Sequence, residues 1–158
     1  MALLVVLAAT GPSSCENVVS YALRPESGVT QGCFEPCLCP IWLMQPLSGR
    51  FILVERRTTE PSLFREFAVI FVDWKFERGD EVVPITGSGR YSVGGEFAVQ
   101  QRMELDLRVG DGPAQHFDSG LVVGGGEFPE IDVRISVNQQ ICFDTVIDVL
   151  ASPLPGKS

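Results

Sequence analysis

The amino-acid sequence predicts an all-β fold: a single antiparallel β-barrel or β-sandwich of about eight strands, with a long disulfide-stapled loop. Apolar and polar residues alternate strictly in 103–109 and 131–137, where every odd position is apolar. Turn-forming residues interrupt such runs at short intervals, and no stripe with helical spacing is present. Strict alternation is typical of an antiparallel strand with one face in water, and short turns between such strands favour a barrel or sandwich.

The expected strands follow the chain in order. They are Val18–Leu23, Phe51–Arg56, Phe64–Phe76, Tyr91–Val93, Glu96–Ala98, Met103–Val109, Ile131–Val137 and Ile141–Val149. We expect Val18–Leu23 at the edge of the sheet. Phe64–Phe76 is apolar on both faces, which predicts a central strand or one beneath another layer. Pro61–Arg65 has room for a single helical turn.

Glycine-rich segments mark the expected turns. Gly94-Gly95 predicts a two-residue hairpin, and Gly110–Pro113, Gly124–Gly126 and Asn138-Gln139 separate later strands. Residues Glu26–Pro46 are rich in Gly, Pro and Cys and lack periodicity. We therefore expect a long surface loop there, of a length that is uncommon unless the loop is functional or stapled.

The amino terminus indicates export. Residues 1–14 contain the apolar run Ala2–Ala9 and then small residues, as in a secretory leader, although the usual basic start is absent. Cys15, just after this segment, is a candidate for a lipid anchor. We expect the β domain to occupy 15–151 and a flexible tail to occupy 152–158.

Composition excludes several classes of protein. The 158 residues are 45% hydrophobic and 20% charged, too apolar for a disordered chain. Twelve basic against twenty acidic residues give a net charge of -8, and no basic stripe is present, which argues against nucleic-acid binding. No apolar run reaches the roughly 18 residues of a membrane span.

Four of the five cysteines predict disulfides. Cys33, Cys37 and Cys39 crowd into QGCFEPCLCP, and Cys142 lies far along the chain. An even number in an exported chain favours two bonds, one local and one long. We expect Cys33–Cys37 with Cys39–Cys142, and the alternative has Cys33–Cys142 as the long bond. A zinc site is disfavoured because the chain has a single histidine and lacks paired CxxC motifs.

The candidates for catalysis are His116, Asp118 and Ser119. Asp118-Ser119-Gly120 resembles the catalytic turn of aspartic proteases, in which two aspartates share a proton. Leu121 departs from that pattern, and no second Asp-Thr/Ser-Gly occurs. His116 is the only imidazole base, and no Gly-x-Ser-x-Gly elbow accompanies it. We therefore expect no catalytic residue.

Two kinds of binding remain open. Six aspartates could place carboxylates at one end of the barrel and bind Ca²⁺, although no loop has the spacing of a known calcium loop. They are Asp106, Asp111, Asp118, Asp132, Asp144 and Asp148. Trp42 lies in the stapled loop, where an exposed aromatic ring could contact a protein or carbohydrate partner.

Four segments carry a resemblance: QGCFEPCLCP, ITGSGRYSVGGEF, LDLRVGDGPAQHFDSG and CFDTVIDV. Together they resemble a group of uncharacterised exported bacterial proteins with a GCFxPCxCP cysteine loop and an antiparallel β domain, over most of the chain after Ser20. The resemblance implies export and a β fold. It implies no activity, and no catalytic residue can be carried over.

The sequence thus predicts an exported or cell-surface protein with a non-catalytic binding or structural role. The alternative is a small extracellular hydrolase that uses His116 or Asp118. The expected partner is a protein or carbohydrate, with no nucleic acid, no membrane span and no cofactor apart from the calcium considered above.

Overall fold

The computed structural model describes residues 17–38, 42–57, 61–123 and 127–156. The expected leader, Cys15 and Cys39 lie outside these residues. The described chain is all-β, and its strands form one antiparallel sheet. It holds no helix with the length and apolar character to cross a membrane. The predicted fold class is confirmed.

The strands are longer and more numerous than expected. In chain order they are β1 (Val18–Leu23), β2 (Gly28–Cys33), β3 (Trp42–Pro46), β4 (Ser48–Arg56), β5 (Phe64–Arg78), β6 (Glu81–Gly94), β7 (Gln100–Val109), β8 (Ala114–Asp118), β9 (Val122–Val123), β10 (Ile131–Ser136) and β11 (Phe143–Pro153).

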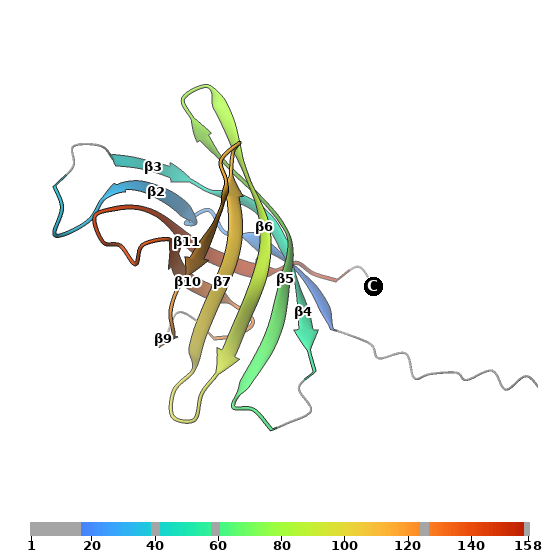
Figure 1. The fold of residues 1–158 in the computed structure, drawn as a ribbon. Coiled ribbons are helices and arrows are strands. Elements are labelled where there is room, and N and C mark those ends of the chain that lie inside the picture. The colour runs from blue at the N-terminus through green and yellow to red at the C-terminus, as the bar shows by residue number, and fades with distance from the viewer. Residues whose placement is uncertain (1–16, 39–41, 58–60, 124–126, 157–158) are drawn as a thin grey trace, which may run out of the picture.

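Eight of these strands close into a ring, so the fold is a barrel (Figure 1). The ring runs β1-β4-β5-β6-β7-β8-β10-β11 and closes where β1 pairs with β11, with Tyr21 opposite Pro153 and Leu23 opposite Ala151. The prediction that Val18–Leu23 is an edge strand is wrong. Closure of a barrel gives every strand of the ring two neighbours, and the neighbour β11 comes from the far end of the chain.

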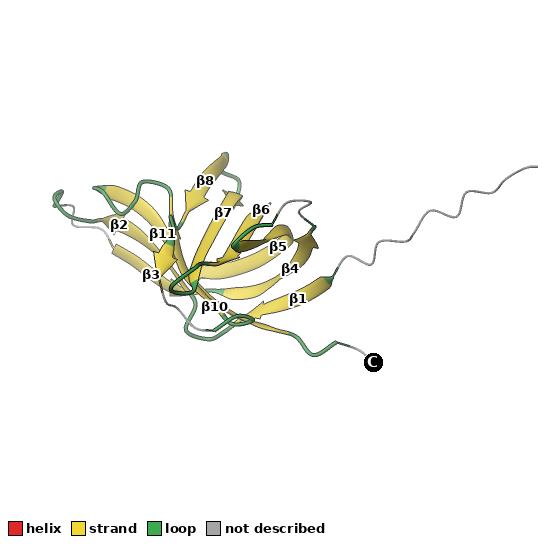
Figure 2. Cartoon of the chain, turned by 90° about the horizontal axis from the view of Figure 1, so that it is seen from below, coloured by secondary structure: helices red, strands yellow, loops and turns green. Residues whose placement is uncertain are grey.

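The hairpin of β2 and β3 projects from this ring and is called the arm here (Figures 1 and 2). β2 pairs with the first half of β11, from Cys33 opposite Phe143 to Gly28 opposite Asp148. β3 pairs only with β2 among the described strands. The expected loop over Glu26–Pro46 is therefore wrong. The alternation of apolar and polar residues in β2 and β3 is weak because many of their positions, and those of the turn between them, are glycine, cysteine or proline.

A β-bulge explains why the sequence of β5 has apolar residues at both odd and even positions. Before the bulge the buried residues, Phe67 and Val69, have odd numbers. After it the buried residues, which include Val72 and Trp74, have even numbers. The register with β6 breaks between Val69 and Val72, and Phe71 lies there with a φ of 51° and 74% of its surface exposed. An extra residue in one strand shifts its inward face by one position. β5 is thus buried on one face only, contrary to the expectation of a doubly covered strand.

Glycines on the neighbouring strand accommodate the bulge. Gly87 and Gly89 of β6 face Val72 and Val69, on either side of the break. A Cβ atom on Gly89 would overlap the backbone carbonyl of Glu104 on β7. Glycine is required where two backbones approach this closely. The Gly-Ser-Gly segment therefore has a structural role in the close packing of β6 on β7.

The structure differs from the sequence-based expectation in four smaller features. The β6–β7 connection spans 95–99, so the two-residue hairpin at Gly94-Gly95 is wrong, and no strand covers Glu96–Ala98. Residues 61–63 form no helical turn, and β5 begins at Phe64. β11 runs to Pro153, and Leu154 donates its N–H to Ser20, so the chain stays paired beyond the expected end of the domain.

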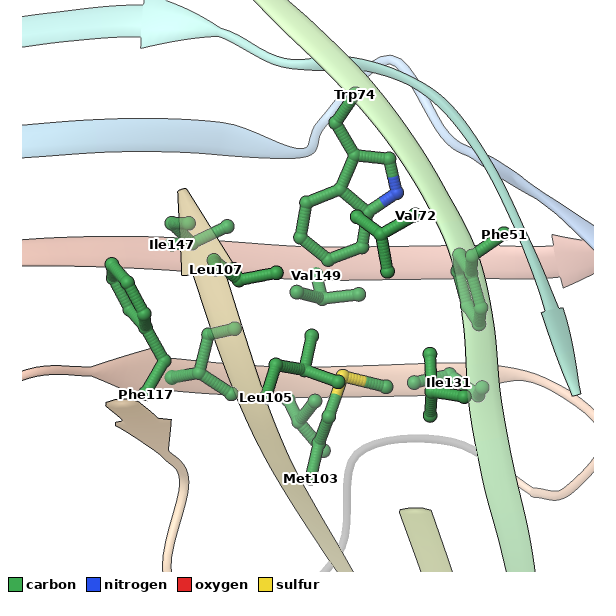
Figure 3. Packing of buried hydrophobic residues seen from close by; sticks show 14 of the residues in the cluster. Phe51, Val72, Trp74, Met103, Leu105, Leu107, Phe117, Ile131, Ile147 and Val149 are labelled. Atoms are coloured by element: carbon green, nitrogen blue, oxygen red, sulfur yellow. The ribbon is translucent and has the colours of Figure 1, made fainter. Parts of the chain in front are cut away.

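The barrel interior is filled by side chains and forms the core (Figure 3). Trp74, Met103 and Ile147 are among its fully buried members and come from β5, β7 and β11. Tyr21 stacks on Phe51 with ring centroids 5.3 Å apart. Because apolar side chains occupy the interior, function is expected on the outside of the barrel or on the arm.

The bulge generates a test. Phe71→Gly should stabilise the protein by about 1 kcal/mol, because a left-handed backbone costs a non-glycine residue about that much and little packing is lost. Phe71→Val should destabilise it. Urea unfolding measures both. The control is Phe97→Gly, at a side chain that is 94% exposed but outside the positive-φ region. Destabilisation by Phe71→Gly would contradict the strained bulge.

Candidate functional site

A disulfide joins the tip of the arm to the start of β11. Cys37 is bonded to Cys142 with their Cα atoms 4.7 Å apart, across a sequence separation of 105 residues. Cys33 is disulfide-bonded as well. Both expected partners of Cys142, Cys39 and Cys33, are therefore wrong, and so is the expected Cys33–Cys37 bond. The expectation of a long bond to Cys142 is confirmed. Spacing cannot select the partner because three cysteines lie within seven residues.

Backbone hydrogen bonds fix the same junction. Phe34 donates its N–H to the carbonyl of Cys142 over 2.9 Å, and Cys37 donates to the carbonyl of Phe34 over 3.1 Å. Ile141 donates to the carbonyl of Asn138 over 3.0 Å. The turn of the arm and the approach to β11 are thus held together by main-chain bonds as well as by the disulfide.

Large apolar side chains are exposed around this junction. Trp42, at the start of β3, makes an edge-to-face contact with Phe34, with ring centroids 5.3 Å apart. The group defined here as the arm tip comprises Phe34, Leu38, Trp42, Met44, Ile141 and Phe143. Five of these are exposed: Leu38 98%, Met44 72%, Phe143 62%, Trp42 55% and Ile141 51%.

The strand register places the arm tip on both faces of the sheet. Trp42, Gly32 and Asp144 are direct cross-strand partners and share one face, as directly paired residues do. Phe143 has the opposite parity and shares its face with Cys33, on the side where Ile147 enters the barrel core. The apolar side chains thus surround the tip.

The arm is nearly free of charge. Between Gly28 and Gly49 the sequence has one charged residue, Glu35, whereas 20% of the whole chain is charged. Arg78 of β5 brings a cation to the base of the arm, where it donates to Gln31 of β2 over 3.1 Å. An apolar surface without charge is suited to an apolar partner.

Asp144 anchors the segment that precedes β11. It is 2% exposed, and its carboxylate accepts the N–H groups of Asn138 at 2.9 Å, Gln140 at 2.7 Å and Thr145 at 2.8 Å. Gln139, Gln140 and Cys142 have φ values of 52°, 60° and 55°. Such conformations cost free energy in non-glycine residues, and the carboxylate offsets that cost. Asp144 is therefore structural.

The three candidates for catalysis, His116, Asp118 and Ser119, lie elsewhere, on β8 and just after it. Asp118 accepts two hydrogen bonds from the Arg102 guanidinium, at 2.8 and 3.2 Å. Glu104, its cross-strand neighbour, pairs with Arg90 and lies 3.1 Å from Arg102. Arg102 lowers the pKa of Asp118, and Arg90 lowers the pKa of Glu104. Ionised carboxylates paired in this way form a stabilised ladder on the outer face.

The geometry does not support a hydrolase. Ser119 Oγ accepts the N–H of Met103 at 2.9 Å and donates to the carbonyl of Gly120 at 2.7 Å, so both of these partners are main-chain groups. His116 Nδ1 lies 2.9 Å from the Asp106 carboxylate. A catalytic pair needs nucleophile and base within hydrogen-bond reach, and a shared-proton dyad needs a second free carboxylate. Among the described residues neither arrangement is formed.

One group could hold a metal ion. Glu104, His116 and Asp118 each offer an atom within 4.8 Å of the others, which makes this the one such trio in the described part of the chain. Ca²⁺ takes six to eight oxygen ligands, whereas this trio supplies two carboxylates and a nitrogen. Both carboxylates already accept hydrogen bonds from arginines. The donor set fits Ca²⁺ poorly.

The six aspartates do not form a common site. Asp118 is the only one of them in the trio, Asp106 pairs with His116, and Asp144 anchors its own turn. Asp148 accepts the Arg134 guanidinium at 2.6 and 3.1 Å. These four aspartates have separate partners.

A hollow of about 310 Å³ lies beside β1, at a different place from the arm. Tyr21, Phe67 and Phe128 contribute to its wall, and burial raises the pKa of Tyr21 to about 12. Arg65 lies over the Phe128 ring at 4.8 Å and pairs with Glu55 at 2.8 Å. The positive charge of Arg65 is therefore already paired with a carboxylate of the same chain.

Comparisons with known proteins give no further assignment. No family model, no curated protein and no solved structure matches the chain. The resemblance to exported proteins with a GCFxPCxCP loop therefore stays a prediction. Trp42 was the only member of the arm tip singled out in the sequence. The uncharged run from Leu38 to Gly49 was the signal for Met44 and Leu38. Phe143 and Ile141 reach the tip through the pairing of β11 with β2 and through the disulfide, and no local pattern indicates either contact.

The paired carboxylates predict a pH dependence. Because Arg102 lowers the pKa of Asp118 in the folded state, the pair stabilises the protein above the usual value of 3.8, and this stabilisation is lost as pH falls through the lowered value. Asp118→Asn should cost about 0.5 kcal/mol at pH 7. Urea midpoints of both proteins should differ at pH 7 and converge as pH falls below the lowered pKa of Asp118. A constant difference would contradict the pairing.

The disulfide should matter for stability. Cys37→Ser with Cys142→Ser should lower the free energy of unfolding by about 4 kcal/mol, because the bond closes a loop of about a hundred residues in the unfolded chain. Urea unfolding without reductant measures this. After full reduction the two proteins should have nearly equal midpoints. A double variant as stable as the wild type under oxidising conditions would contradict the prediction.

Proposed function

We propose that the protein is an exported, non-catalytic binding protein that contacts its partner through the arm tip. The single observation that carries this is the exposure of Leu38, Trp42, Met44, Ile141 and Phe143 around one disulfide-stapled junction. Exposed apolar side chains gathered in one place mark interaction sites, because they gain free energy when a partner removes them from water.

The rest of the described surface differs from the arm because it carries ion pairs. The outer face of β6, β7 and β8 carries ion pairs between Arg90 and Glu104 and between Arg102 and Asp118. Such a solvated face is suited to keep an acidic protein soluble. The disulfide supports export, since these bonds persist in oxidising compartments. The barrel serves as a rigid base that presents the arm.

The hydrolase alternative lacks support in the geometry. Ser119 bonds to main-chain groups, and His116 bonds to Asp106 rather than to a nucleophile. A binding role needs only the arm, whose main-chain bonds and disulfide keep its shape without a partner. Pre-formed shape lowers the entropic cost of binding.

The experiment measures retention of the protein on washed cells that produce it. Leu38→Ser and Met44→Ser should each shift at least half of the retained protein to the wash, because an apolar contact is lost. Phe97→Ser is the matched control: this side chain is 94% exposed, on the β6–β7 connection away from the arm. His116→Ala should also retain wild-type behaviour. Equal retention of the arm variants and the control would contradict the proposal.

A further inference from the structure

We propose that the partner of the arm tip is the surface of a lipid bilayer, into which the tip inserts to a shallow depth. This inference rests on the binding role proposed for the arm. The observation that separates a bilayer from a protein partner is the distribution of the apolar side chains. Trp42 and Met44 lie on one face of the sheet, Phe143 of β11 lies on the other, and Leu38 lies at the turn of the arm. A fluid lipid bilayer can contact apolar side chains on every side of a projecting tip. A protein surface that docks on the tip covers one of its faces.

Part of the main chain at this junction is already paired within the protein. In lipid every N–H and C=O group needs a partner within the protein. Phe34, Cys37 and Ile141 donate their N–H groups to carbonyls within the junction itself. The Cys37–Cys142 bond ties the two chain segments, so their side chains Leu38 and Ile141 are presented together.

Other features limit the depth of insertion. β3 has no neighbour on its second side among the described strands, so its open edge carries main-chain groups that need water or headgroups. Glu35 lies exposed in the turn and carries the single charge of the arm. Trp42 has an apolar ring and a polar N–H, a combination enriched at the headgroup level. These features favour insertion by about 5–10 Å, the depth typical of interfacial segments.

Charge predicts which lipid surface is preferred. The chain has a net charge of -8, and no Lys or Arg lies between Gly28 and Gly49. Binding therefore draws on apolar insertion and not on attraction to anionic headgroups. We expect stronger binding to phosphatidylcholine vesicles than to vesicles that contain phosphatidylglycerol at low salt, and salt should reduce the difference.

The experiment is co-sedimentation of the oxidised full chain with phosphatidylcholine vesicles. Leu38→Asp and Met44→Asp should each lower the partition coefficient about tenfold or more, since removal of one buried apolar side chain corresponds to at least that factor. Phe97→Asp adds the same charge away from the arm and should leave partitioning within about twofold. Glu35→Gln should strengthen binding, because it removes the one charge of the arm.

Fluorescence gives an independent readout of the mode of contact. The chain has two tryptophans, of which Trp74 is 1% exposed and Trp42 is 55% exposed. Insertion should shift the emission of Trp42 to shorter wavelength, and lipids brominated near the headgroup should quench it. Trp42→Phe should still bind vesicles but lose the shift. Binding that requires anionic lipid, or binding without any change in emission, would overturn insertion of the tip.

The outcomes distinguish this inference from the proposed function. Wild-type protein that stays on washed cells through the arm, yet fails to bind phosphatidylcholine vesicles, overturns the lipid partner and leaves the binding role of the arm intact. A protein or carbohydrate of the cell surface would then be the partner. Failure in both assays overturns both proposals. Vesicle binding that the Asp substitutions at positions 38 and 44 abolish, and that Phe97→Asp retains, supports the bilayer.

Discussion

The division of the β11 edge between two partners is the constraint on which the rest of the structure depends. Along one edge β11 pairs with β10 from Val146 to Ala151. Along the other edge its last residues pair with β1 and close the barrel, while 143–148 pair with β2 and carry the arm. A strand has only two edges, so these pairings determine where the ring ends and the arm begins.

This arrangement separates the core from the contact surface. Ile147 and Val149 lie in the closed part of the barrel and are fully buried, whereas Phe143, on the same face, lies beyond it and is exposed. The same alternation that fills the core therefore exposes an aromatic ring at the tip. Charge is divided in parallel, with ion pairs on β6, β7 and β8 and a single charged residue on the arm.

Much of the sheet could be predicted from the sequence, and the errors have physical causes. Met103–Val109 and Ile131–Val137 alternate cleanly, and both segments lie almost wholly within observed strands. The bulge at Phe71 could not be predicted from the sequence, because it changes which face of the strand each later side chain points to without changing the residue types. Of the candidate site, Trp42 was found as an isolated aromatic residue, and its neighbours were not recognised as a group.

The sequence by itself determined the all-β class, some of the turns, the long disulfide to Cys142 and the lack of charge in the arm, because these follow from residue types and their local order. Only the tertiary structure decided the closure by β1 and β11, the pairing of Cys37 with Cys142 and the gathering of Leu38 with Ile141. Each of these joins segments more than a hundred residues apart. Local periodicity shows which way a side chain faces and does not specify which distant strand lies beside it.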